Sequence, residues 1–180
     1  MGDSLITVVA ILLAAILMFI FPMMAMSERN DDVAELAVQT AISEFVNKAR
    51  NSGKITTADY DKLLAELHAT GNTYNVEMEL QVLDANPARK KTEGLAFSTP
   101  TTKLGENIYY SIYTSQIMDE IDGKGVKYMK EGDILTVKAA NTNNTISQML
   151  KNFFYSLSGN DTYSIVGSSS GQVTVTGSGS

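Results

Sequence analysis

The first part of the chain is one long run of apolar residues. No charged side chain occurs from Ser4 to Ser27, and Leu5 to Met26 consists almost entirely of Leu, Ile, Val, Ala, Met and Phe. As a helix with a rise of about 1.5 Å per residue, these roughly 22 residues would reach about 33 Å, the thickness of the hydrocarbon core of a bilayer. The run predicts a membrane-spanning helix within residues 1–27. A buried core helix is less favoured, because such helices usually keep one polar edge.

A cleaved secretory signal is the second alternative for this run. Ala25-Met26-Ser27 fits a small-x-small cleavage site, but no Lys or Arg precedes the apolar residues, and the run is longer than a typical signal core. Neither flank is basic: Asp3 precedes the run, and Glu28, Arg29, Asp31 and Asp32 follow it. The remainder of the chain is rich in Ser, Thr, Asn and Gly. We therefore expect a single-pass protein of the cell membrane whose C-terminal domain is extracytoplasmic.

Apolar residues recur with helical spacing from Asp32 to Arg50. Pro22 should kink a helix that continues from the apolar run, near Met18, whereas a capping box of Asp32 with Glu35 would begin a separate helix. One predicted face is apolar and carries Ala34, Val38, Ala41, Ile42, Phe45, Val46 and Ala49; the opposite face carries Glu35, Gln39, Ser43, Asn47 and Arg50. This apolar face needs a partner to cover it.

A second, shorter helix is predicted to fold back against the first. Thr56 and Asp59 have the spacing of a capping box, and Gly71 is placed to end the helix. Its apolar positions are Tyr60, Leu63, Leu64 and Leu67. Residues 28–71 are therefore predicted to form an amphipathic helical hairpin.

The remaining residues, 72–176, predict an α+β domain with a mainly antiparallel sheet. Strict alternation predicts a half-buried strand from Tyr74 to Val82, followed by a long loop from Asp84 to Lys103. A helix is predicted over Glu106–Ile121, stopped by Gly123 and Gly125. Two strands, Val126–Met129 and Ile134–Ala139, are predicted to be joined by the turn Lys130–Asp133. The last predicted elements are a helix from Asn144 or Thr145 through Phe154 and a hairpin of Tyr163–Val166 with Gln172–Thr176 around Ser168–Gly171. Residues 177–180 are predicted to be a disordered tail.

Composition excludes several classes of function. The formal net charge is -6 and the sequence pI is about 4.8, which disfavours nucleic acid because phosphate binding needs clustered Lys and Arg. The chain has no cysteine, so it has no disulfide, thiolate nucleophile or Cys-bound zinc. The domain must be held together by packing alone.

The candidate chemistry is sparse and favours structural interpretations. His68 is the only histidine and falls in the last turn of the second predicted helix, where a helix dipole suits it. Asp119, Glu120 and Asp122 lack the ligand pattern of a calcium loop, and Gly123-Lys124-Gly125 is too short for a phosphate-binding loop. The aromatic residues Tyr109, Tyr110, Tyr113, Tyr128, Phe153, Phe154 and Tyr155 are interpreted as core, and Arg89-Lys90-Lys91 as a solvated basic run. We expect no enzyme activity, cofactor, metal or small-molecule substrate.

The order of elements resembles the bacterial type IV pilin-like proteins, particularly tight-adherence minor pilins. Those proteins begin with a glycine at the prepilin-peptidase cut and continue into a charge-free helix, and Met1–Thr7 is a minimal version of that start. The resemblance covers Gly2 to about Arg50 and implies cleavage after Gly2, which makes Gly2 and Asp3 the candidate processing residues. Thr7 stands where these families usually carry a glutamate, and no basic leader precedes Gly2.

The same helix physics favours assembly with other copies. A helix that is apolar on all sides can leave lipid and bury the same surface against neighbouring helices, and Ala10, Ala14 and Ala15 allow close approach. The expected partners are membrane lipid and copies of this chain or other pilin-like subunits, in a surface filament or secretion apparatus. The predicted packing residues are Leu5, Val8, Ile11, Leu12, Ala14, Ala15, Met18, Phe19 and Pro22. The alternative is a membrane-anchored accessory or binding protein of a transport or conjugation machine.

Overall fold

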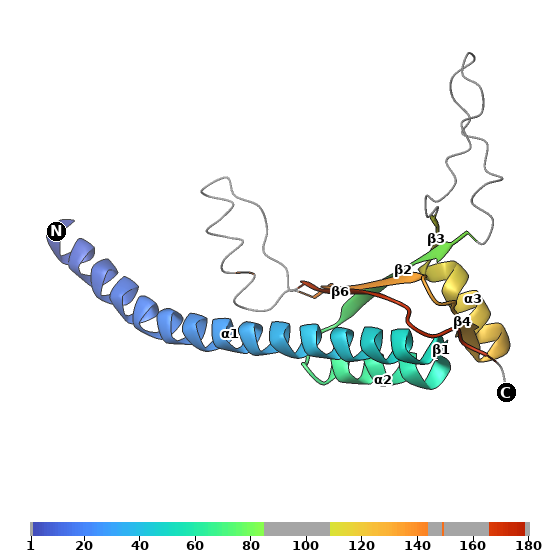
Figure 1. The fold of residues 1–180 in the computed structure, drawn as a ribbon. Helices are drawn as coiled ribbons and strands as arrows, with labels where there is room; N and C mark the ends of the chain where they lie inside the picture. The colour runs from blue at the N-terminus through green and yellow to red at the C-terminus, as the bar shows by residue number, and fades with distance from the viewer. Residues whose placement is uncertain (1, 85–108, 144–148, 150–165, 179–180) are drawn as a thin grey trace, which may run out of the picture.

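A computed structural model describes residues 2–84, 109–143, 149 and 166–178 (Figure 1). A long N-terminal helix is followed by a small domain of short helices and antiparallel strands, so the predicted α+β class is confirmed. In chain order the elements are α1 (Gly2–Ser52), β1 (Lys54–Thr56), α2 (Thr57–His68), β2 (Tyr74–Leu83), β3 (Tyr109–Tyr113), α3 (Thr114–Lys124), β4 (Val126–Tyr128), β5 (Ile134–Asn141) and β6 (Val166–Gln172).

The helix α1 runs without a break through both predicted helical segments. It keeps Pro22 inside, and no new helix begins at Asp32, so the capping-box alternative is wrong. The N-terminal part of α1 curves away from the line of the rest (Figure 1). All seven residues of the predicted apolar face, Ala34, Val38, Ala41, Ile42, Phe45, Val46 and Ala49, are buried. The second half of α1 is therefore part of the domain core.

Four strands form the main sheet in the order β3-β2-β5-β6, and every neighbouring pair is antiparallel. The predicted strand over Tyr74–Val82 is confirmed as β2, whose alternate residues Val76, Met78 and Leu80 are buried. These residues share one core with α1, with Leu63 and Leu67 of α2 and with Ile117 and Ile121 of α3. One face of the sheet thus packs against the second half of α1, and α2 lies along α1 as the predicted hairpin (Figure 1).

The segment predicted as one helix over Glu106–Ile121 is divided, and that prediction is wrong for its first part. Tyr109–Tyr113 is the edge strand β3, paired with β2, and the helix α3 begins only at Thr114. Tyrosine fits a pleated sheet surface, and the available β2 edge decides the outcome. Gly123 lies inside α3, and Gly125, in the left-handed conformation with φ of 73°, ends it. Residues 106–108 lie outside the described residues.

The two strands predicted to form a hairpin around Lys130–Asp133 do not pair with each other. The turn itself is confirmed, since the Asp133 amide donates to the Lys130 carbonyl at 3.1 Å and Gly132 has a φ of 97°. However, β4 pairs with β1, a short strand that the sequence did not predict, while β5 pairs with β2 and β6. A small second sheet, β1-β4, closes the end of the domain where α1 stops.

The predicted C-terminal hairpin is also wrong. Ser168–Gly171 was expected to be its turn, but it lies within the single strand β6, next to β5. The small residues serve the packing of α1 instead: a Cβ on Gly167 would lie 2.7 Å from Val38 Cγ1, and one on Gly171 would lie 3.3 Å from Val46 Cγ1. Glycine in a strand often marks such a close approach.

The chain after β6 returns to the end of α1. The Thr174 amide donates to the Arg50 carbonyl at 3.0 Å, and the Gly177 amide donates to the Met129 carbonyl at 2.9 Å. Gly177 is thus tied to the domain rather than to the predicted tail, and residues 179–180 lie outside the described residues. Residues 85–103 of the predicted loop and residues 163–165 of the predicted hairpin also lie outside the described residues. The same holds for the helix predicted over 144–154, apart from Met149.

Candidate functional site: the exposed apolar helix

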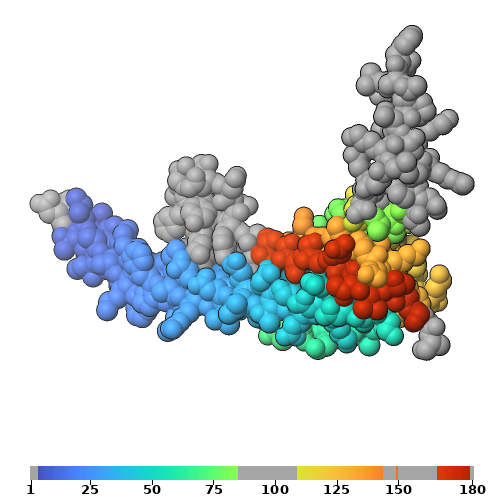
Figure 2. Space-filling view, in the orientation of Figure 1, coloured from blue at the N-terminus to red at the C-terminus, as the bar shows by residue number. Residues whose placement is uncertain are grey.

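The first half of α1 exposes its apolar side chains on every side. The large residues predicted to pack in an assembly are 56 to 77% exposed, and they are Leu5, Val8, Ile11, Leu12, Met18 and Phe19. Ala14, Ala15 and Pro22 are exposed as well. Figure 2 shows this part of α1 projecting from the rest of the molecule. Leaving a large apolar side chain in water costs roughly 1.5–3 kcal/mol relative to burial, so this surface requires a cover of lipid or protein.

The composition of this half of α1 suits a bilayer. Its most apolar stretch has a mean hydropathy of 2.9, and none of it is buried inside the fold. Among the residues that the structure describes, one helix, near the N-terminus, is long and apolar enough to cross a membrane. The exposure excludes a core helix, whereas a signal sequence near the N-terminus would pass the same test of minimum length and hydropathy. The candidate processing residues Gly2 and Asp3 are the first two residues of the helix.

Burial by the domain begins near the charged residues that follow the apolar run. Ala34 and Val38 are in the core, but Val33 and Leu36, on another side of the same helix, are 62% and 69% exposed. Val33, Leu36, Ala37 and Thr40 line a shallow groove against Glu66 of α2 and Ala69, which follows the end of α2. The predicted packing set did not include Val33 and Leu36. Their position could have been recognised from the sequence, because Val33 and Leu36 are large apolar residues that fall outside the apolar face of this amphipathic helix.

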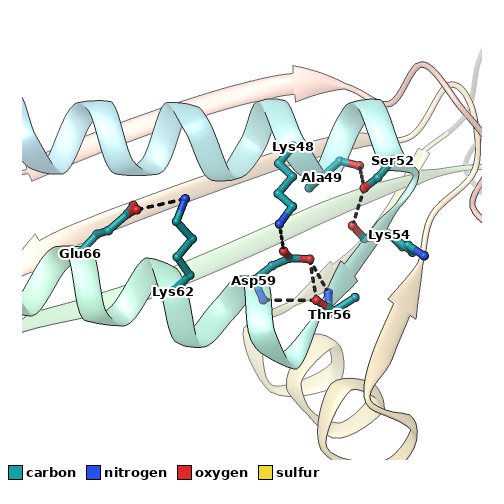
Figure 3. A network of polar contacts seen from close by, with 8 residues as sticks. All are labelled: Lys48, Ala49, Ser52, Lys54, Thr56, Asp59, Lys62 and Glu66. Atoms are coloured by element: carbon teal, nitrogen blue, oxygen red, sulfur yellow. Dashed lines mark hydrogen bonds and ion pairs between the residues drawn. The ribbon is translucent and has the colours of Figure 1, made fainter.

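The joint between α1 and α2 fixes the long N-terminal helix to the domain (Figure 3). The predicted capping box is confirmed, because the Asp59 amide donates to the Thr56 hydroxyl and the Thr56 amide donates to the Asp59 carboxylate, at 3.2 and 3.1 Å. Lys48 of α1 forms an ion pair with Asp59. Burial alone would raise the pKa of the Asp59 carboxyl, but hydrogen bonds from Lys48 and Thr56 and the charge of Lys48 lower it below its ordinary value.

The residues considered for chemistry are distributed over the surface rather than gathered in a pocket. His68 is exposed at the last position of α2. Glu120 pairs with Lys127 at 2.6 Å, while Asp119 and Asp122 are exposed. In the part of the chain that the structure describes, no three His, Asp or Glu side chains come together as metal ligands. Arg89-Lys90-Lys91 and the aromatic residues Phe153, Phe154 and Tyr155 lie outside the described residues.

The tyrosines interpreted as core are placed at the margin of the sheet instead. Tyr110, Tyr113 and Tyr128 are 40 to 59% exposed. Tyr109 is half-buried, and its hydroxyl donates to the Gly132 carbonyl at 3.3 Å. The helical spacing on which the core interpretation depended does not exist, because three of these residues belong to the strand β3. Within the described part of the chain, the apolar surface of α1 is thus the remaining candidate site.

No family model, curated protein or solved structure matches this chain.

Proposed function

We propose that this chain is a pilin-like structural subunit of a bacterial surface filament or secretion apparatus, with its domain on the outer side of the membrane. One observation carries the proposal: α1 is a single continuous helix whose first half is exposed and apolar and whose second half forms the core of the domain. Such a helix can hold the domain in a bilayer and can later bury the same surface against neighbouring subunits.

The small residues of the exposed half support helix packing. Ala14 and Ala15 lie side by side near the middle of the apolar segment and are both exposed. Without a hydrophobic driving force in lipid, helices associate through close packing, for which small residues are favourable. Leu12, Met18 and Phe19 lie three or four residues from Ala15, so they neighbour it on the helix surface and offer larger exposed side chains for such packing.

The alternative is a single-pass accessory or binding protein whose helix never leaves the bilayer. The length of the apolar segment, about 33 Å for roughly 22 residues, favours it equally, because it matches the hydrocarbon thickness. The two functions differ in whether copies pack through α1.

A charge in the middle of the apolar segment separates the two functions. Ala14→Glu should prevent filament formation, because a carboxylate would be buried among apolar helices, while a plain anchor should only insert less well. Ala58→Glu is the matched control, since Ala58 is exposed in the first turn of α2, where a negative charge suits the helix dipole.

Cells producing each form are sheared, and the sheared and membrane fractions are examined by immunogold electron microscopy with an antibody to the domain. Labelled filaments from the unmodified chain and from Ala58→Glu, but not from Ala14→Glu, would support the pilin-like subunit. Filaments that form normally with Ala14→Glu would exclude assembly through this helix. Label confined to the membranes, with no filaments from any form, would favour the accessory protein.

A further inference from the structure

The outer edge of β6 makes hydrogen bonds of the kind that a neighbouring strand makes. β6 is the last strand of the main sheet. The carboxamide of Gln39 on α1 binds both backbone groups of Ser168: the Ser168 amide donates to Gln39 Oε1 at 3.1 Å, and Gln39 Nε2 donates to the Ser168 carbonyl at 3.0 Å. The backbone of Ser168 therefore faces away from β5.

Backbone groups in a strand face alternate sides, so the amide and carbonyl of Ser170, two residues after Ser168, also face away from β5. Its backbone amide and carbonyl face the outer edge, its side chain is exposed, and no described residue bonds those two backbone groups. Proteins usually protect an edge strand with proline or charged residues. β6 contains neither. The edge at Ser170 is thus able to accept another strand.

The opposite edge of the sheet, β3, has a matching position. The amide and carbonyl of Met78 in β2 both bond to the Thr114 hydroxyl, at 2.8 and 3.2 Å, so these groups face the β3 side. Leu80, two residues on, faces the same way and pairs with Ile112. The backbone of Ser111, next to Ile112, must then face away from β2, toward the outer edge.

Strand direction determines how copies could meet. Gly167 lies against Val38 and Gly171 against Val46, so β6 runs in the same direction as α1. Because each neighbouring pair in the sheet is antiparallel, β3 runs opposite to β6. Two copies side by side with parallel α1 helices would therefore present β3 of one antiparallel to β6 of the other. Antiparallel pairing of two β6 strands would instead point the two α1 helices in opposite directions.

We propose that β6 of one copy pairs with β3 of a second copy, with Ser170 opposite Ser111, and extends the sheet from copy to copy. This inference rests on the proposed function in one respect, since it takes all α1 helices to enter the same bilayer. Gln39 occupies the edge at Ser168, so the incoming strand meets β6 at Ser170 and Gln172. The contact is head-to-tail and leaves an edge open at each end, so rows can grow without closing.

Disulfide cross-linking tests this pairing directly, because the chain has no cysteine of its own. The full chain carrying Ser111→Cys and Ser170→Cys is oxidised in membranes of producing cells and separated on a non-reducing gel. We expect a ladder of dimers, trimers and larger species that collapses on reduction. A bond within one copy cannot compete, since three strand spacings of about 4.8 Å separate β3 from β6, well beyond disulfide reach.

Three controls define the result. Ser111→Cys with Thr136→Cys places the second thiol on the inner strand β5 and should give monomers only, as should each single variant. In the same antiparallel register Gln172 lies opposite Tyr109, so Tyr109→Cys with Gln172→Cys should give the same ladder. This second pair tests the register independently in case the first pair disturbs folding.

Two outcomes would overturn the pairing while leaving the anchor in place. In the first, both cysteine pairs stay monomeric although the protein is in the membrane fraction. In the second, Ser170→Cys alone forms dimers, which would indicate contact between two β6 strands. If the protein is instead absent from the membrane fraction, the proposed anchor fails and the row fails with it.

Discussion

Asp59 shows how one side chain joins the long N-terminal helix α1 to the rest of the domain. It caps α2 and also pairs with Lys48 of α1. Its pKa in the folded chain lies below its ordinary value, so the ionised form stabilises the fold. This contribution is complete above about pH 4, the ordinary range of a carboxyl group, and it is lost as the pH falls through the lowered folded pKa.

Asp59→Asn is therefore expected to destabilise the domain by about 1 kcal/mol near neutral pH, mainly through the cap. The difference from the unmodified chain should shrink as the pH falls below about 4. Urea unfolding of the full chain in detergent, followed by circular dichroism, measures both effects. Asp61→Asn is the control, because Asp61 is an exposed carboxylate on the same helix. Equal losses from the two variants at every pH would contradict the role of Asp59.

At the scale of elements, the contact between α1 and β6 depends on glycine. A Cβ on Gly167 would lie 2.7 Å from Val38 Cγ1 and 2.8 Å from Ile42 Cδ1. Gly167→Val should destabilise the domain by about 1–3 kcal/mol, because it overpacks this contact. Gly123→Ala in α3 is the matched control, since nothing beyond its own turn of helix lies within 4 Å of an added Cβ, and it should cause no loss. Thermal unfolding of the full chain in detergent compares them, and a harmless Gly167→Val would mean that α1 and β6 do not pack this closely.

At the scale of the whole molecule, the first and second halves of α1 have separate roles. The core includes α1 residues only from Ala34 onward, while the apolar run before them is exposed. A chain of residues 28–180 should therefore keep the domain fold and partition into the aqueous phase of a detergent phase separation, whereas the full chain enters the detergent phase. Circular dichroism and phase partition check both statements. Unfolding of residues 28–180 would show that the apolar run also stabilises the domain.

Local periodicity explains which parts of this molecule could be predicted from the sequence. The amphipathic face of α1, the capping box at Thr56, the alternating strand β2 and the turn at Gly132 were all predicted correctly. Each of these patterns depends on residues close together in the chain, where spacing and backbone preference decide the conformation. The apolar run that forms the candidate site is also a local pattern, because its residues are consecutive in the chain.

Only the tertiary structure decided the conformation of Tyr109–Tyr113 and Ser168–Gly171 and the strand with which β4 pairs. A tyrosine-rich segment became a strand because the β2 edge was available. A Gly- and Ser-rich segment became a strand because it pairs with β5, and its glycines leave room for α1 to pack closely. Strand β4 pairs with β1, which lies far earlier in the chain. By itself, the sequence determined the apolar run and its length. The placement of that run outside the core, on the same rigid helix that carries the domain, was decided by contacts between residues far apart in the chain, which local patterns do not encode.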